Sequence, residues 1–425
     1  MILTMFAIFF LTMLIGFPIA FCLGLSSAFY LIIADIPLNI IPQRMFSGID
    51  SFVILCVPGF ILAGNLMNVG GITERIISFS NALVGRVRGG LSLANIAASV
   101  FFAGISGTAA ADTASIGAIL IPAMKKTGYE ADFSCAVTAA SSMCGPIIPP
   151  SLPMIVAGTV AGLSVSKLFI AGVVPGLLLG LALGVVSYYI SKKRNHPKEP
   201  PMSMKQFFLS IWNAVWALLL IVLIFVGIAN GYFTPTEAAM VAVVYAIVIG
   251  VFVYRNLGWR DLVKIFLDTA ITTSSLMMLV GLANLFAWIL TTEQVPQMVA
   301  EWMLALTRNK YLLLLMINIL LLFVGTFMET IAAVMILMPI LLNVAVQVGV
   351  DPIQFTVMCV LNLVIGLNTP PVGVCLFIAS GIGKVSIMDI SKALVPFLAA
   401  SLIVLGLVTY VPQVTLFLPN LLLGK

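Results

Sequence analysis

Two carboxylic acids stand inside otherwise apolar stretches of this sequence. Asp112 lies in GTAAADT and Glu329 lies in GTFMET. An ionisable side chain within apolar sequence is costly and is functional by default. Such a carboxylate can attract a cation, relay a proton, or cap the start of a helix by accepting free backbone N–H groups. We favour a functional role over capping alone, and the choice between cation and proton stays open.

Each acid is followed further along the chain by a Gly/Pro break, GPIIPP at 145–150 and GLNTPP at 366–371. A broken helix exposes unpaired carbonyls at one end and unpaired N–H groups at the other. The carbonyls suit Na⁺ and the N–H ends suit a carboxylate. We therefore predict two Na⁺ sites, each between one acid-containing segment and one break. The candidate Na⁺ ligands are Ser106, Gly107, Thr108, Gly145, Gly325, Thr326, Gly366, Asn368, Thr369 and Pro370.

A second group of residues is expected to contact a bound small molecule or to couple its binding to that of the ion. Close helix packing by small residues is the alternative for any single Gly, Ser or Thr. The four breaks together favour function, because each coincides with a proline or an acid. Two asparagines in the group can either bridge helices or line a site. The group comprises Asp112, Thr113, Glu329, Thr330, Pro149, Pro150, Asn65 and Asn284.

The composition decides the class of protein that holds these residues. Of the 425 residues, 62% are hydrophobic and 8% are charged, against about 25% charged in soluble proteins. The mean hydropathy is +1.20. These values exclude a soluble enzyme, a disordered chain and a nucleic-acid binder. No P-loop, HExxH motif or Ser/His pair is present, and the only histidine is His196. We therefore predict an all-α polytopic membrane protein that is not an enzyme and needs no cofactor or transition metal.

A bilayer core requires about 20 apolar residues per helix. The linker 191–206 carries five Lys or Arg residues, which places it in the cytoplasm. The N-terminus is apolar from Ile2 and is expected to be a retained first span rather than a signal peptide. Counting crossings from the linker places the N-terminus inside and the C-terminus outside. The expected full spans are 2–34, 50–69, 168–190, 207–229, 236–254, 265–290 and 391–418.

The acid-containing segments are too short to cross the membrane twice. Residues 91–124 must leave the cytoplasm and return, yet this segment is shorter than the roughly 40 residues that two full spans need. We predict re-entrant helical hairpins at 91–124 and 311–342, with broken helices at 131–162 and 354–382. Such backbone is tolerated only where it is buried in protein or lines a wet cavity.

The two hairpins and breaks recur in the same order, which indicates a duplication. Asp112 is separated from Glu329 by nearly the same length of chain as Pro149 is from Pro370. The crossing count gives the copies opposite orientations. Inverted repeats with Gly/Pro-interrupted helices are typical of secondary transporters, which bind their substrate where the repeats meet. The amphipathic segments 72–86 and 293–306 are expected to be interfacial arm helices that carry the hairpins.

The stretch from Gly104 to Pro153, and its second copy from Val324 to Ser380, resemble the large membrane subunit of TRAP (tripartite ATP-independent periplasmic) transporters, the DctM-like family of the ion transporter superfamily. The resemblance covers essentially the whole chain. It implies a Na⁺-driven importer of organic anions in a prokaryotic inner membrane. It also implies an elevator mechanism, in which the hairpins and broken helices slide against a scaffold and the anion binds between the tips. The substrate stays open among sialic acid, C4-dicarboxylates, keto acids and sugar acids.

The resemblance implies two partners, a small four-helix membrane subunit and a periplasmic substrate-binding protein. We expect the small subunit to be a separate polypeptide, because this sequence has no additional N-terminal helices. The alternatives are a self-sufficient anion transporter of the same superfamily and a proton-coupled carrier that uses Asp112 and Glu329. The expected organisation is scaffold at 1–71, first repeat at 72–190, linker at 191–206, scaffold at 207–290, second repeat at 293–382 and a final span at 391–418.

Overall fold

The computed structural model describes residues 1–198, 203–370 and 373–424. The chain is 81% helical, with no strand in these ranges. Pro371 and residues 199–202 of the expected linker lie outside the described residues. The first half contains α1 (Ile2–Ile15), α2 (Ile19–Ile33), α3 (Ile40–Ile49), α4 (Cys56–Val69), α5 (Ile72–Val84), α6 (Gly90–Ser106), α7 (Ala109–Lys126), α8 (Ala131–Ser141), the 3₁₀ turn η1 (Ser142–Cys144), α9 (Leu152–Ala161) and α10 (Val165–Lys193).

The second half of the chain is also helical in its described residues. It contains α11 (Met204–Ala229), α12 (Pro235–Val248) with the π-helical turn η2 (Ile249–Val253), α13 (Trp259–Thr292), α14 (Val295–Leu306), α15 (Lys310–Gly325), α16 (Thr330–Gln347), α17 (Pro352–Gly366), α18 (Val374–Gly383), α19 (Ile387–Tyr410) and α20 (Pro412–Leu423).

By length and composition, six helices among the described residues can cross a membrane. They are α10, α11, α12 with η2, α13, α16 and α19, and a seventh span results if α4 and α5 count as one. The chain is therefore a multi-span membrane protein, as its composition indicates.

Three expected spans differ from the observed helices. The segment 2–34 is two helices that pack against each other, because Gly16 adopts φ 95° and Pro18 interrupts the backbone hydrogen bonding. The segment 391–418 is likewise divided before Pro412. The segment 50–69 is helical only from Cys56, and a bend of 70° separates α4 from α5. Hydrophobicity did not reveal the interruptions at Gly16, Pro18 and Pro412.

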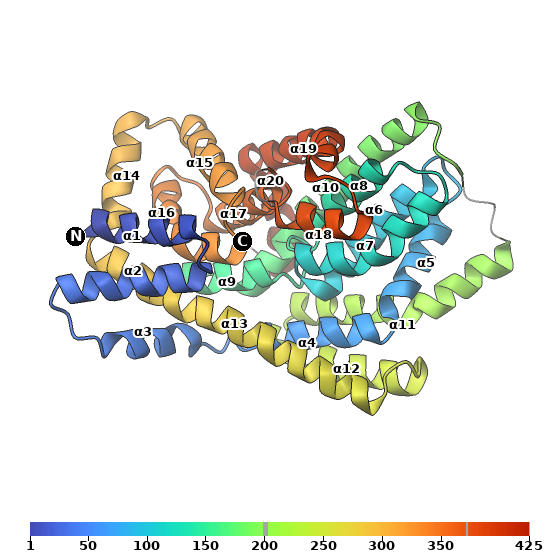
Figure 1. Ribbon diagram of the computed structural model, residues 1–425, viewed down its shortest axis with the longest axis horizontal. Helices are drawn as coiled ribbons and strands as arrows, with labels where there is room; N and C mark the ends of the chain where they lie inside the picture. Colours follow the sequence, from blue (N-terminus) through green and yellow to red (C-terminus); the bar gives the residue numbers. More distant parts are fainter. Residues whose placement is uncertain (199–202, 371–372, 425) are drawn as a thin grey trace.

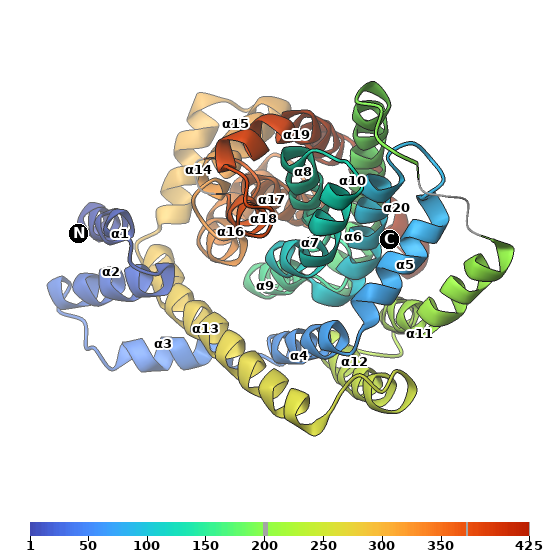
Figure 2. The same cartoon turned by 45° about the vertical axis from the view of Figure 1, so that its right-hand side comes forward.

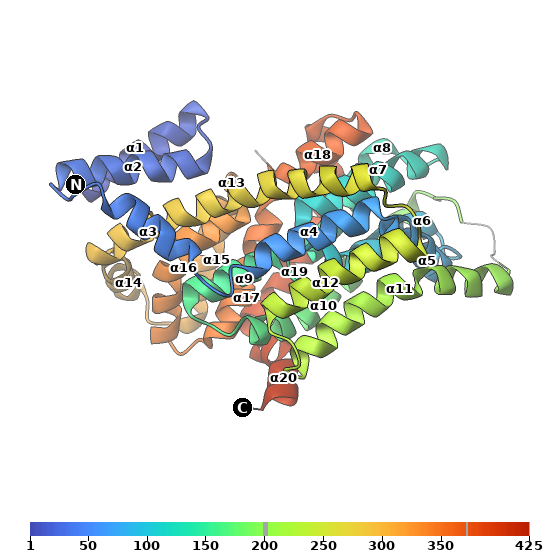
Figure 3. The same cartoon turned by 90° about the horizontal axis from the view of Figure 1, so that it is seen from below.

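The helices form two groups. The long helix α13 runs diagonally along one side of the molecule and contacts α2, α3 and α4 (Figures 1 and 2). Helices α4, α12 and α11 follow beside it in a row (Figure 3). The helices α6–α10 and α15–α19 form the second group, on the other side of α13 (Figure 2).

The second group contains two sets of elements with a constant separation in the sequence. Helices α7 and α16 begin at Ala109 and Thr330 and end at Lys126 and Gln347, so the separation is the same at both ends. Helices α8 and α17, which begin at Ala131 and Pro352, have this separation as well. Each set contacts the other in the same way, since α7 packs against α18 and α16 packs against α9.

Candidate functional site

The first turn of the site, between α6 and α7, consists of Gly107 and Thr108. Gly107 has φ +63°, which favours glycine. The Thr108 hydroxyl accepts the N–H of Ala111 at 3.3 Å and so caps α7. The Gly107 carbonyl accepts the N–H of Leu152 at 3.3 Å, at the start of α9. The structure thus brings the first turn against the break at 145–150, which contains the cis peptide bond Pro149–Pro150.

Asp112 is completely buried behind this turn. Its Oδ1 accepts a hydrogen bond from the Ser106 hydroxyl, whereas its Oδ2 has no partner among the described residues. A Cβ added to Gly145 would lie 2.8 Å from Asp112 Oδ2 and 3.0 Å from the Thr108 carbonyl oxygen. Asp112 Oδ2 and the Thr108 carbonyl oxygen therefore lie close together beside Gly145, which has no side chain to fill the space. Oxygen atoms grouped in this way suit a hard cation.

The second turn, between α15 and α16, has a different cap. Glu329 Oε2 accepts the N–H groups of Ile331 at 2.8 Å and Ala332 at 3.2 Å, so Glu329 caps α16. The second turn also meets its break, because a Cβ on Gly366 would lie 2.5 Å from the backbone of Gly325. For Glu329 the structure thus contains the capping arrangement that was one of the alternatives.

The two acids are not equivalent, although the sequence motifs align them with each other. The helix starts Ala109 and Thr330 are slightly further apart in the sequence than Asp112 and Glu329 are. Matching the helix starts places Asp112 opposite Ala333. The motifs match acid to acid, whereas the helix boundaries match Thr108 to Glu329, each the N-cap residue of its helix.

The remaining polar candidates fall into two classes. Asn368 is completely buried, and neither atom of its amide has a partner among the described residues; the buried Thr330 hydroxyl has none either. The hydroxyls of Thr113, Thr326 and Thr369 instead donate to carbonyls of nearby residues in the chain, at 2.9, 2.7 and 3.0 Å. Pro370 is exposed.

The two asparagines both bridge helices and line cavities. Asn65 Nδ2 donates to Thr269 Oγ1 at 2.9 Å and lines a cavity of about 260 Å³ beside Ser106 and Thr108. Asn284 Nδ2 donates to the Arg44 carbonyl at 2.8 Å and lines a separate cavity of about 410 Å³. The structure therefore does not bring Asn65 and Asn284 together.

Two polar clusters that were not predicted from the sequence join α6 to α8 in the first half and α15 to α17 in the second half. In the first half, Asn95 Nδ2 donates to Thr138 at 2.7 Å, and Ser141 donates to Asn95 Oδ1 at 3.2 Å. In the second half, Asn362 Nδ2 donates to Asn318 Oδ1 at 2.7 Å. Isolated Asn residues in apolar helices were the signal that could have located them, because such side chains bridge membrane helices.

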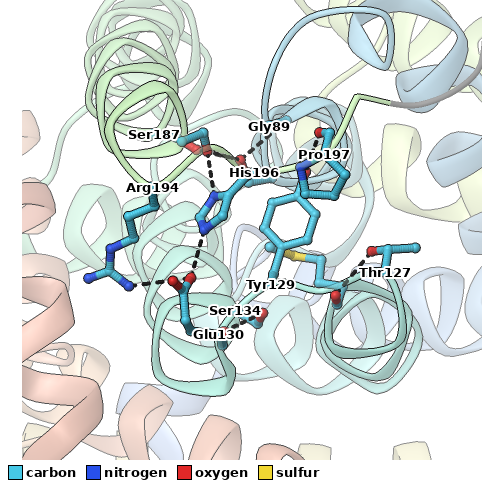
Figure 4. A network of polar contacts seen from close by, with 12 residues as sticks. Gly89, Thr127, Tyr129, Glu130, Ser134, Ser187, Arg194, His196 and Pro197 are labelled. Carbon is cyan, nitrogen blue, oxygen red and sulfur yellow. Dashed lines mark hydrogen bonds and ion pairs between the residues drawn. The ribbon is translucent and has the colours of Figure 1, made fainter.

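A polar network holds the start of the linker to the start of α8 (Figure 4). His196 Nε2 lies 2.6 Å from Glu130 Oε2, and Arg194 Nη1 lies 3.4 Å from the same oxygen. Because a carboxylate only accepts, Nε2 carries the proton, and Nδ1 lies 3.0 Å from the Ser191 hydroxyl. Burial acts to raise the pKa of Glu130, but the hydrogen bond from His196 and the nearby charges outweigh it, so the pKa lies below its usual 4.5.

We expect Glu130→Gln to lower the melting temperature at pH 7, because it removes the charge that His196 and Arg194 contact. The loss should be about 1 kcal/mol or less, since Glu130 is half-exposed. A carboxyl group whose pKa is lower in the folded state than in the unfolded state stabilises the fold at pH values above its unfolded-state pKa. This stabilisation is lost as the pH falls through the folded-state pKa. The difference between wild type and variant should therefore shrink below pH 4.5. Thermal unfolding across pH measures this, and a difference that persisted in acid would contradict it.

Comparisons with known proteins identify the family. The model of the tripartite ATP-independent periplasmic transporter DctM component matches residues 6–414. The sialic acid TRAP transporter large permease protein SiaM of Vibrio cholerae is 42% identical over 410 residues, covering 96% of each chain. The isethionate TRAP transporter permease protein DctMQ of Oleidesulfovibrio alaskensis is 44% identical, over 97% of this chain and 65% of that longer protein. The C4-dicarboxylate large permease DctM of Rhodobacter capsulatus is 39% identical, over 96% and 97%.

Solved structures share the fold at low sequence identity. The YdaH transporter of Alcanivorax borkumensis matches with a TM-score of 0.60 at 15% identity, covering 88% of each chain. MtrF of Neisseria gonorrhoeae matches with a TM-score of 0.58 at 13% identity, covering 89% of this chain and 85% of its own. The fold is thus that of membrane transporters. The match to the family model and the sequence identity to the relatives show that this chain belongs to the DctM family, the large permease component of TRAP transporters.

Proposed function

We propose that this chain is the transport subunit of a Na⁺-coupled, binding-protein-dependent importer that moves an organic anion into the cytoplasm. Family membership supports the transport role. The observation that carries Na⁺ coupling is Asp112, whose buried Oδ2 has no hydrogen-bond partner in the described residues. An unsatisfied buried carboxylate oxygen is costly. A Na⁺ ion that binds there during transport offsets that cost.

The proposed coupling uses two Na⁺ sites. In the first, Asp112, the Ser106 hydroxyl and the Thr108 carbonyl provide oxygens beside Gly145. The second lies where Gly325 and Gly366 meet, and its ligands come from the segment around Asn368 and from Thr330, whose buried polar atoms lack partners among the described residues. The backbone N–H groups at the helix starts that Thr108 and Glu329 do not cap then face the anion between the two turns.

The proposed mechanism is an elevator. The hairpins α6–α7 and α15–α16 are re-entrant, and with the broken helices they move as one body against α13 and its neighbours. The constant separation of the paired helices and the reciprocal contacts of α7 with α18 and α16 with α9 support an inverted repeat. The setting is a prokaryotic inner membrane, with the N-terminus in the cytoplasm and the C-terminus in the periplasm. The partners are a small membrane subunit and a periplasmic substrate-binding protein.

The substrate class is an organic anion. The relatives are named for sialic acid, isethionate and C4-dicarboxylates, all of which carry a carboxylate or sulfonate. The subunit performs no catalysis and needs no cofactor. Two rivals remain, a self-sufficient anion transporter and a proton-coupled carrier.

Uptake into proteoliposomes tests the proposal. The chain is reconstituted with its small subunit, with or without the binding protein, and an inward Na⁺ gradient is imposed or omitted. We expect uptake only when both Na⁺ and the binding protein are present. Uptake without the binding protein would favour the self-sufficient transporter, and uptake driven by a proton gradient alone would favour the proton-coupled carrier.

A further inference from the structure

A second polar cavity, lined by no residue of either turn, lies between α3, α9, α13 and α16. Its volume is about 410 Å³, within the range of small-molecule sites. Arg44 is the only charged side chain, and no acid is present, among the described residues that line it. The other polar groups that line it are Ser47, Ser51, Thr159, Asn284 and Thr291.

Arg44 is held in place rather than extended into solvent. Its guanidinium carbon lies 4.7 Å from the centre of the Trp288 ring, a cation–π contact. The Arg44 carbonyl accepts the Asn284 amide at 2.8 Å, and a Cβ on Gly48 would lie 2.5 Å from Asn284 Cβ. Helix α3 therefore lies tightly against α13, and this contact fixes the position of the cation at the cavity.

The charge of Arg44 is not neutralised within the described part of the chain. The ion pairs among the described residues involve Glu130 and Asp389 and do not include Arg44. A half-buried cation without a carboxylate partner is costly in a membrane protein. A guanidinium presents a planar set of donors that matches a carboxylate, and it binds such an anion through two parallel hydrogen bonds.

We propose that this cavity is a loading site for the organic anion, in which Arg44 binds the substrate's carboxylate or sulfonate before the anion reaches the two turns. The inference rests on the proposed function. The cavity is lined by α3 and α13 from one group of helices and by α9 and α16 from the other, so relative motion of the groups changes its shape. The expected topology places the C-terminal end of α13, where Asn284 and Thr291 lie, towards the periplasm.

The test compares Arg44→Gln and Arg44→Lys with a matched control, Arg260→Gln, which removes an exposed charge at the opposite end of α13. Sialic acid, succinate and isethionate are the probes, and uptake is measured in the reconstituted system with its binding protein. We expect Arg44→Gln to raise the half-saturating anion concentration about ten- to hundredfold, as loss of a charged hydrogen bond implies. Half-saturation by Na⁺ should not change, Lys should restore part of the affinity, and the control should behave as wild type.

A second readout separates this inference from Na⁺ coupling. The thermal stability of the purified permease is measured with and without each anion, which requires no transport. We expect at least one anion to stabilise the wild type and the Arg260→Gln control but not Arg44→Gln. The inference is overturned if none of the three anions stabilises the wild type. It is also overturned if Arg44→Gln lowers the maximal rate while leaving the half-saturating concentration unchanged. If uptake does not depend on Na⁺ but an anion still stabilises the permease, the Na⁺-coupling proposal is refuted and the inference about Arg44 is not.

Discussion

Asp112→Asn is expected to reduce Na⁺-driven uptake by about 100-fold or more, because it removes the charge that balances the ion while preserving the shape of the side chain. Asp112 Oδ1 is engaged by Ser106, so the substitution acts mainly on the unpartnered Oδ2. The measurement is the initial rate of uptake in proteoliposomes at several Na⁺ concentrations, together with direct binding of radioactive Na⁺ to the purified permease.

Glu329→Gln is the matched control for that experiment. Because Glu329 caps α16 through two backbone N–H groups, its replacement should cost about 1 kcal/mol of stability and leave most of the transport. A wild-type rate and wild-type Na⁺ dependence in Asp112→Asn would disprove the first Na⁺ site. Equal losses in both variants would instead indicate that the two acids act as a pair.

Gly366→Ala is the second change for which we expect a large effect. Its Cβ would lie 2.5 Å from the Gly325 backbone, a contact that no side-chain rotation relieves. The α15 and α17 helices must separate, and overpacking of this kind costs about 1–3 kcal/mol or more. We expect a clearly lower melting temperature and loss of uptake, since the proposed second Na⁺ site lies at this contact.

Gly406→Ala provides the comparison, because Gly406 lies in α19 and, outside the adjoining backbone of that helix, no atom of the described residues lies within 4 Å of an added Cβ. Alanine favours a helix over glycine by roughly 0.5–1 kcal/mol, so this variant should be as stable as wild type or slightly more stable. Unfolding can be followed with a thiol-reactive dye, since all six cysteines are buried. Identical melting temperatures for the two variants would contradict the argument.

Much of the chain could be predicted without a structure. The low charge content indicates a multi-span membrane protein, and helices occupy the segments expected from hydrophobicity. The breaks at Gly107 and at 145–150 were located because glycine and proline interrupt helices through their own backbone chemistry. Such features depend on residues close together in the sequence, so local pattern is sufficient.

Other properties were decided by tertiary structure alone. Asp112 and Glu329 look alike in sequence. Among the described residues, however, Asp112 has an oxygen without a partner and Glu329 caps a helix, because Thr108 already occupies the cap position in the first turn. Arg44 lies between two expected spans in the sequence, and only α13 brings Trp288 and Asn284, both distant in the sequence, beside it. The sequence by itself determined which chemical groups the membrane protein carries. Packing between distant helices decided which of those groups lack a partner, because a hydrogen bond or charge is satisfied by whatever lies nearest in space, and sequence spacing does not reveal that neighbour.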